Sequence, residues 1–202
     1  MIINKYYFFR FLIGCITIWM GNRCTPSSHN NHQQYAQEQQ VMHIKDKRGN
    51  HIVKLVWDDQ TTLIESDQKV WQKSAESQVY LSDKRPFLTV TSQGLHIQVT
   101  SHHQPADDWQ IRFLDDTMQV LQTNQSIYQV VQPQPDKFWV YKSGREVGKT
   151  KMKNGLIDVD GYGIDLKIPA QTNAYAYTVL MMYEIPEAIR FTLMAELLKK
   201  GI

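Results

Sequence analysis

Short alternations of apolar and polar residues run through the middle of the chain. In one of them Leu95, Ile97 and Val99 are apolar and are separated by His96 and Gln98. A period of two is the pattern of a strand with one buried face, so each such run predicts a strand. Trp109, Ile111 and Phe113 alternate in the same way, and further short apolar runs lie at Ile52–Trp57, Leu63–Ile64, Val70–Trp71, Phe87–Val90 and Met118–Val120.

Turn-forming residues separate these runs at short intervals. They fall at Asp46–Asn50, Ser66–Gln68, Ser92–Gly94, Asp115–Asp116, Ser143–Gly144, Asn154–Gly155 and Gly161–Gly163. Strand, turn and strand in succession is the hairpin signature, and Asn-Gly is its strongest short form. Because no crossover helices fit between the runs, we expect an antiparallel meander and not a parallel sheet.

The C-terminal stretch is the part of the chain that reads as helical. Residues Ala174–Tyr183 have no polar face, so a helix there has to be buried on all sides. Pro186 is well placed to begin a second helix, which Gly201 ends. The second helix has one apolar face with Ile189, Leu193, Met194, Leu197 and Leu198, and one polar face with Glu187, Arg190, Glu196 and Lys200.

A long meander has to hide its edges and fill its interior. The fold class we expect is therefore mainly β with a C-terminal helix (α+β), an antiparallel meander that closes into a barrel-like sheet around an apolar C-terminal helix. A membrane span at Ala174–Tyr183 is not expected, because a span needs about 20 apolar residues and Glu184 and Glu187 follow this short run.

This layout resembles the tubby C-terminal-like superfamily, which includes the LURP-one-related proteins and the phospholipid scramblases. The similar local patterns are Ile44–Gly49, Tyr141–Lys149 and the helical stretch Ala174–Leu198. The resemblance covers the chain from about Val41 onward. It implies a barrel with a central helix, membrane-lipid association for some members and no known activity for many. It assigns no lipid-binding residue here.

The N-terminus predicts export. Lys5 and Arg10 precede the apolar run Phe11–Met20. A basic start followed by a short apolar run is the pattern of a secretory signal. We therefore expect a signal peptide or lipoprotein-type leader over residues 1–24, with an uncleaved anchor as the alternative.

Two cysteines in the leader are candidates for lipidation. Leu12–Cys15 resembles the lipobox of bacterial lipoproteins, although cleavage before Cys15 would leave an apolar start to the mature chain. Cys24 follows the full apolar run and precedes a polar stretch, but Arg23 stands where a lipobox has a small residue. The sequence leaves open which cysteine is modified, and an ordinary signal remains the alternative to lipidation.

Residues 25–40 are rich in Gln, Asn, Ser and His. Such a stretch cannot bury enough surface to offset its ordering entropy, so we expect a flexible polar tether. Residues 41–202 are then expected to form a β-rich domain with C-terminal helices. Because both cysteines of the chain lie in the leader, this domain has to be stabilised by packing and not by a disulfide.

A net charge of +2 and the lack of a Lys/Arg cluster argue against a nucleic-acid partner. No Gly-x-Ser-x-Gly elbow occurs, and no catalytic residue or cofactor is predicted, so we do not expect an enzyme. The loop with His102, His103, Asp107 and Asp108 gathers imidazoles and carboxylates, which makes it a candidate metal site if these groups converge.

Three tyrosines mark a possible ligand cavity. Tyr175, Tyr177 and Tyr183 lie on the buried C-terminal stretch, where each hydroxyl needs a partner or lines a cavity. The sequence thus predicts an exported binding or structural module of the bacterial cell envelope. It is expected on the periplasmic side, held to the membrane by its leader or a lipid anchor, with a lipid or an envelope protein as partner. The alternatives are a lipid-interacting domain of the scramblase or tubby kind, and a metal-dependent enzyme that uses His102 and His103.

Overall fold

The computed structural model describes residues 39–46, 48–67, 69–104, 108–161, 164–170 and 172–202. Residues Ala36–Ile202 form one compact unit. Within the described ranges, no helix is long and apolar enough to cross a membrane.

The unit contains one antiparallel sheet of 14 strands, each paired with the next strand in the chain. The strands are β1 (Gln40–Lys45), β2 (His51–Trp57), β3 (Thr61–Ser66), β4 (Lys69–Ser74), β5 (Val79–Ser82), β6 (Arg85–Gln93), β7 (His96–Ser101), β8 (Asp108–Leu114), β9 (Thr117–Gln122), β10 (Gln125–Gln134), β11 (Lys137–Lys142), β12 (Arg145–Lys153), β13 (Leu156–Gly161) and β14 (Ile164–Pro169). The predicted antiparallel meander is confirmed.

Alternation along the strands produces the buried face. Ile97 and Val99 of β7 are fully buried, and their partners on the next strand, Ile111 and Trp109, are buried as well. The hairpin turns hold residues in the left-handed region, as at Asn154 with a φ of 54° and Gly155 with a φ of 73°. The alternation of apolar and polar residues determines which face of the sheet is buried. The turns allow each strand to fold back on the strand before it.

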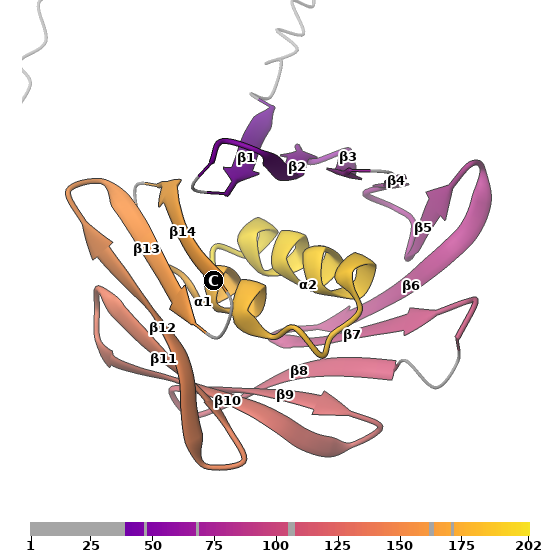
Figure 1. Ribbon diagram of the computed structural model, residues 1–202. Helices are drawn as coiled ribbons and strands as arrows, with labels where there is room; N and C mark the ends of the chain where they lie inside the picture. The colour runs from indigo at the N-terminus through magenta and orange to yellow at the C-terminus, as the bar shows by residue number, and fades with distance from the viewer. Residues whose placement is uncertain (1–38, 47, 68, 105–107, 162–163, 171) are drawn as a thin grey trace, which may run out of the picture. The chain divides into compact units, whose positions relative to one another are not determined.

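The sheet curls into a nearly closed barrel around the C-terminal helices (Figure 1). These helices are α1 (Tyr175–Thr178), the 3-10 turn η1 (Val179–Met181) and α2 (Glu187–Lys199). The expected fold class, a barrel-like sheet around an apolar C-terminal helix, is therefore confirmed. The core consists of the inward side chains of the strands together with most of α2.

The helical stretch differs from the expectation in two respects. Residues Ala174–Tyr183 form only one α-helical turn and one 3-10 turn, and the long helix inside the barrel is α2. The predicted polar face of α2 is also partly wrong, because Glu196 is buried. The reason is that the strands supply partners for its charge.

The Glu196 carboxylate is held by two strands of the barrel wall. Its Oε1 lies 2.6 Å from Nζ of Lys73 on β4 and accepts a 2.8 Å hydrogen bond from the hydroxyl of Tyr80 on β5. Burial and the adjacent negative charge of Glu196 raise the pKa of Tyr80 well above its ordinary value. Next to this group, Trp71 donates from Nε1 to Thr192 of α2 at 3.0 Å. These contacts attach one side of α2 to strands β4 and β5.

A glycine pair lets the helical turn approach the opposite wall. Gly148 of β12 pairs with Gly161 of β13, and Met181 of η1 lies against both. A Cβ atom at Gly148 would lie 2.4 Å from Sδ of Met181 and 2.8 Å from Cα of Gly161. The close packing at this point therefore depends on the absence of side chains.

Candidate ligand-binding site

The site that stands out lies where the sheet fails to close. Strand β1 pairs only with β2 and β14 pairs only with β13, so the sheet has a seam between its first and last strands. These two strands nevertheless lie near each other in the barrel (Figure 1).

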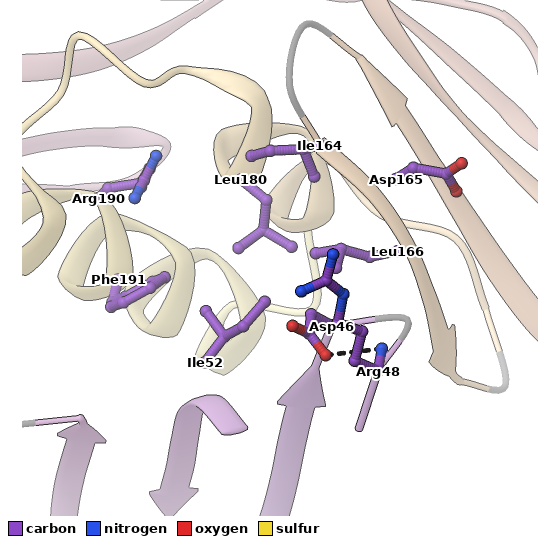
Figure 2. Close-up of a pocket in the computed structure, with 9 residues that line it drawn as sticks. All are labelled: Asp46, Arg48, Ile52, Ile164, Asp165, Leu166, Leu180, Arg190 and Phe191. Carbon is purple, nitrogen blue, oxygen red and sulfur yellow. Dashed lines mark hydrogen bonds between the residues drawn. The ribbon is translucent and has the colours of Figure 1, made fainter. Parts of the chain in front are cut away.

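A pocket of about 270 Å³ opens at this seam. We call it the seam pocket, and its lining residues are Asp46, Arg48, Ile52, Ile164, Asp165, Leu166, Leu180, Arg190 and Phe191. Figure 2 shows Arg190 at one end of the pocket, Arg48 beside Asp46 and Leu166, and the apolar side chain of Leu180 between the two arginines. Its volume lies near the lower end of the range for small-molecule sites, and an apolar lining with a few polar groups is typical of them.

Arg190 is the unusual member of the lining. It belongs to α2, and its Nε atom is buried with no hydrogen-bond partner. Burial lowers the pKa of Arg190 from its ordinary value, although a guanidinium stays protonated in proteins. Its carbon Cζ lies 5.4 Å from the ring centre of Phe191, its neighbour in the chain. A partly buried cation without a hydrogen-bonded partner is costly, so Arg190 calls for an explanation.

The acidic residues of the pocket do not supply that partner. Oδ1 of Asp46 accepts hydrogen bonds of 2.8 Å from the backbone N–H groups of Arg48 and Asn50, and Oδ2 accepts one of 2.7 Å from Nδ2 of Asn50. The Asn50 side chain, followed by these N–H groups and the charge of Arg48, lowers the pKa of Asp46. Asp165 points away from the other lining residues in Figure 2. The carboxylate of Asp46 thus shapes the turn.

A wider, more polar depression of about 890 Å³ adjoins the seam pocket and shares Asp46 and Ile52 with it. Its lining residues are Asp46, Asn50, His51, Ile52, Ser66, Asp67, Lys69, Trp71, Glu187 and Ala188. The depression therefore leads from solvent to the beginning of α2, beside the apolar part of the seam pocket.

The predicted tyrosine cavity is only partly assembled. Tyr175 and Tyr177 line a separate pocket of about 350 Å³, together with residues at the end of the helical stretch. The Tyr175 hydroxyl donates to the backbone oxygen of Asp116 at 2.7 Å, and burial raises the pKa of Tyr177. Tyr183 does not line this pocket; it is half exposed, and its ring centre lies 5.9 Å from Nζ of Lys142.

The predicted metal loop is described only in part. The His102 ring shares a 2.8 Å hydrogen bond with Thr89, and the ring of His103 lies 5.9 Å from that of Phe87. Asp108 accepts hydrogen bonds from Gln98 at 3.0 Å and from Thr100 at 3.3 Å. Among the described residues, no group of three or more His, Cys, Asp or Glu side chains could hold a metal ion. Asp107 lies outside the described residues.

The two candidate cysteines, Cys15 and Cys24, also lie outside the described residues. The seam pocket itself was not predicted from the sequence, which placed Arg190 on the polar face of α2. One signal was available in the sequence. Phe191 and Ala195 place apolar side chains beside the expected polar face, which indicates a helix buried on nearly all sides.

Comparisons of the sequence with family models, with curated proteins and with solved structures found no match. The resemblance to the tubby C-terminal-like superfamily therefore stays a prediction, and the function has to be argued from the site.

Proposed function

We propose that this protein is a binding module that takes the apolar part of a small amphipathic molecule into the seam pocket. The observation that supports this most is the apolar middle of the pocket, formed by Ile52, Leu166, Leu180 and Phe191, at an opening of the barrel to solvent. Burying an alkyl chain there would contribute about 0.8 kcal/mol for each methylene group.

Binding of octanol tests this proposal, because octanol is a neutral amphiphile with a short chain. We expect the purified full chain to bind it with a dissociation constant below about 1 mM, measured by native mass spectrometry from a non-ionic detergent. Replacing Ile52 with Trp places a larger side chain in the apolar part of the pocket, so Ile52→Trp is expected to weaken binding about tenfold or more.

Tyr177→Phe provides the matched control, since Tyr177 lines the other pocket. It is expected to leave octanol binding unchanged. Equal binding by the wild type and Ile52→Trp, or a loss of binding in Tyr177→Phe alone, would place the ligand elsewhere and contradict the proposal.

We further propose that the module is held at the periplasmic face of a bacterial membrane by its leader. The support is the basic start, the apolar run Phe11–Met20 and the polar residues 25–40 that follow. A lipid-interacting role of the tubby or scramblase kind is consistent with both parts of this proposal. The metal-dependent alternative finds no support in the described contacts of His102 and His103.

Fractionation and acyl labelling test the location. We expect the untagged protein in the membrane fraction, and we expect a radiolabelled fatty acid to be incorporated and then lost in either Cys15→Ser or Cys24→Ser. The variant that loses the label also loses its lipid anchor, so much of the cleaved protein should then appear in the soluble fraction. A protein found wholly in the soluble cytoplasmic fraction would contradict the envelope location.

A further inference from the structure

We propose that the ligand of the seam pocket is an anionic amphiphile whose carboxylate or phosphate group binds the guanidinium of Arg190, with its chain against Leu180 and Phe191. This inference rests on the proposed function, because it names the chemical class of the molecule that the pocket takes. It concerns the charge of the ligand, whereas the proposed function concerns only its apolar part.

The first argument is the state of Arg190 in the protein without ligand. Its Nε is buried without a partner, and none of the described residues forms an ion pair or a hydrogen bond with its guanidinium group. Buried donors are almost always satisfied in native proteins. Arg190 also lines the seam pocket, so a ligand bound there can supply an acceptor for the guanidinium that the protein does not supply.

The second argument is that the nearby acceptors are engaged elsewhere. The hydroxyl of Tyr128 on β10 donates to Oε2 of Glu184 at 3.4 Å, and Glu184 forms an ion pair with Lys142. Glu187 precedes Arg190 by three residues on α2 but is exposed. Burial lowers the pKa of Arg190, and the charge of Glu187, followed by that of Tyr128, only opposes this lowering; neither residue is bonded to Arg190. The cation is thus kept without a bonded partner inside the protein.

The third argument concerns the other charges that face the pocket. Asp46 uses both carboxylate oxygens within its own turn, and Asp165 is directed away from the lining. Arg48 is exposed and lies beside Asp46, separated from Arg190 by Leu180 in Figure 2. The carboxylate of Asp46 is therefore already hydrogen-bonded within its own turn, and a guanidinium fork can bind a carboxylate or a phosphate of a ligand through two parallel hydrogen bonds.

A hydrogen bond to a charged group contributes about 1.5–3 kcal/mol, which corresponds to about 10- to 150-fold in affinity. The full-length wild type, in a non-ionic detergent, is therefore expected to bind octanoate or octyl phosphate at least about tenfold more tightly than octanol. Comparing octanoate with octyl phosphate distinguishes a fatty-acid source from a phosphorylated-lipid source. Acetate and inorganic phosphate show whether the charged group suffices without a chain, and we expect both to bind weakly.

The variants separate Arg190 from the rest of the pocket. Arg190→Gln is expected to weaken binding of the preferred anion about tenfold or more and to leave octanol binding unchanged. Arg190→Lys keeps the positive charge but lacks the two parallel N–H donors of the guanidinium group. We therefore expect its affinity for the anion to lie between those of the wild type and Arg190→Gln. Arg145→Gln is the matched control, and because Arg145 of β12 is exposed and does not line the pocket, it is expected to leave both affinities unchanged.

Thermal unfolding provides a readout that a structural role would not produce. Without ligand, Arg190→Gln should melt no lower than the wild type, because it removes a cation that has no bonded partner. With octanoate or octyl phosphate, only proteins that retain Arg190 should show the full rise in melting temperature.

The outcomes distinguish the two proposals. If the wild type binds octanol and the two anions equally, or if Arg190→Gln retains the preference for the anion, the anionic class is overturned and the proposed function stands. If none of the alkyl ligands binds the wild type, the proposed function fails and the present inference fails with it. A low melting temperature of Arg190→Gln without ligand would identify Arg190 as structural and would also overturn the inference.

Discussion

Glu196→Ala is expected to lower the free energy of unfolding by about 3–5 kcal/mol. The side chains of Lys73 and Glu196 are only 9% and 8% exposed, and the Tyr80 hydroxyl shares the same carboxylate oxygen. Removing the carboxylate would leave a buried ammonium group and a buried hydroxyl without their acceptor. Chemical denaturation of the purified protein, followed by tryptophan fluorescence, measures the loss.

A second variant identifies the origin of this loss. Replacing both Lys73 and Glu196 with Met removes the pair without leaving a charge, so the double variant should recover most of the lost stability. Glu187→Ala, at an exposed position of the same helix, should change stability by no more than about 0.5 kcal/mol. A double variant less stable than Glu196→Ala would contradict the interpretation, because the pair itself would then be the stabilising element.

Gly148→Ala is expected to destabilise the protein by about 2–3 kcal/mol through overpacking. The added Cβ would lie 2.4 Å from Sδ of Met181, 2.8 Å from Cα of Gly161 and 2.9 Å from the backbone oxygen of Asp160. Met181 can move, but the two backbone atoms belong to the neighbouring strand. The strand pair or the helical turn therefore has to shift, and chemical denaturation would report the cost.

Gly155→Ala is the control for this variant. Gly155 has a φ of +73°, and a Cβ added to it would meet no atom within 4 Å, so its replacement is expected to cost about 1–2 kcal/mol in backbone strain alone. Crowding predicts that Gly148→Val costs still more than Gly148→Ala. A valine no more harmful than the alanine at this position would show that the space beside Met181 is larger than the contacts indicate.

The strands could be predicted because a half-buried strand requires alternation. The run with Ile97 and Val99 became β7, and the Asn154–Gly155 turn lies where its residue types predicted. The turn at Thr123 and Asn124 also takes positive φ values, of 48° and 67°, but no glycine or proline marks it in the sequence. A hairpin turn without glycine or proline forms because the strands on either side of it pair with each other. The residue types at the turn do not predict that pairing.

The candidate site could not be predicted for a related reason. The seam pocket combines Ile52 from β2, Leu166 from β14 and Arg190 from α2, and these residues meet only because the sheet curls until its ends approach. The spacing of these three residues along the chain does not predict that they lie together in the fold. The burial of Glu196 could not be predicted for the same reason, since its partners Lys73 and Tyr80 lie on distant strands.

The most direct measurement is a crystal structure of the protein with a bromine-labelled alkyl carboxylate, in which anomalous scattering locates the end of the chain. We predict a bromine peak in the seam pocket among Ile52, Leu180 and Phe191, with the carboxylate at Arg190. A peak beside Tyr175 and Tyr177, or no bound ligand at concentrations that saturate binding in solution, would contradict the assignment of the seam pocket as the binding site.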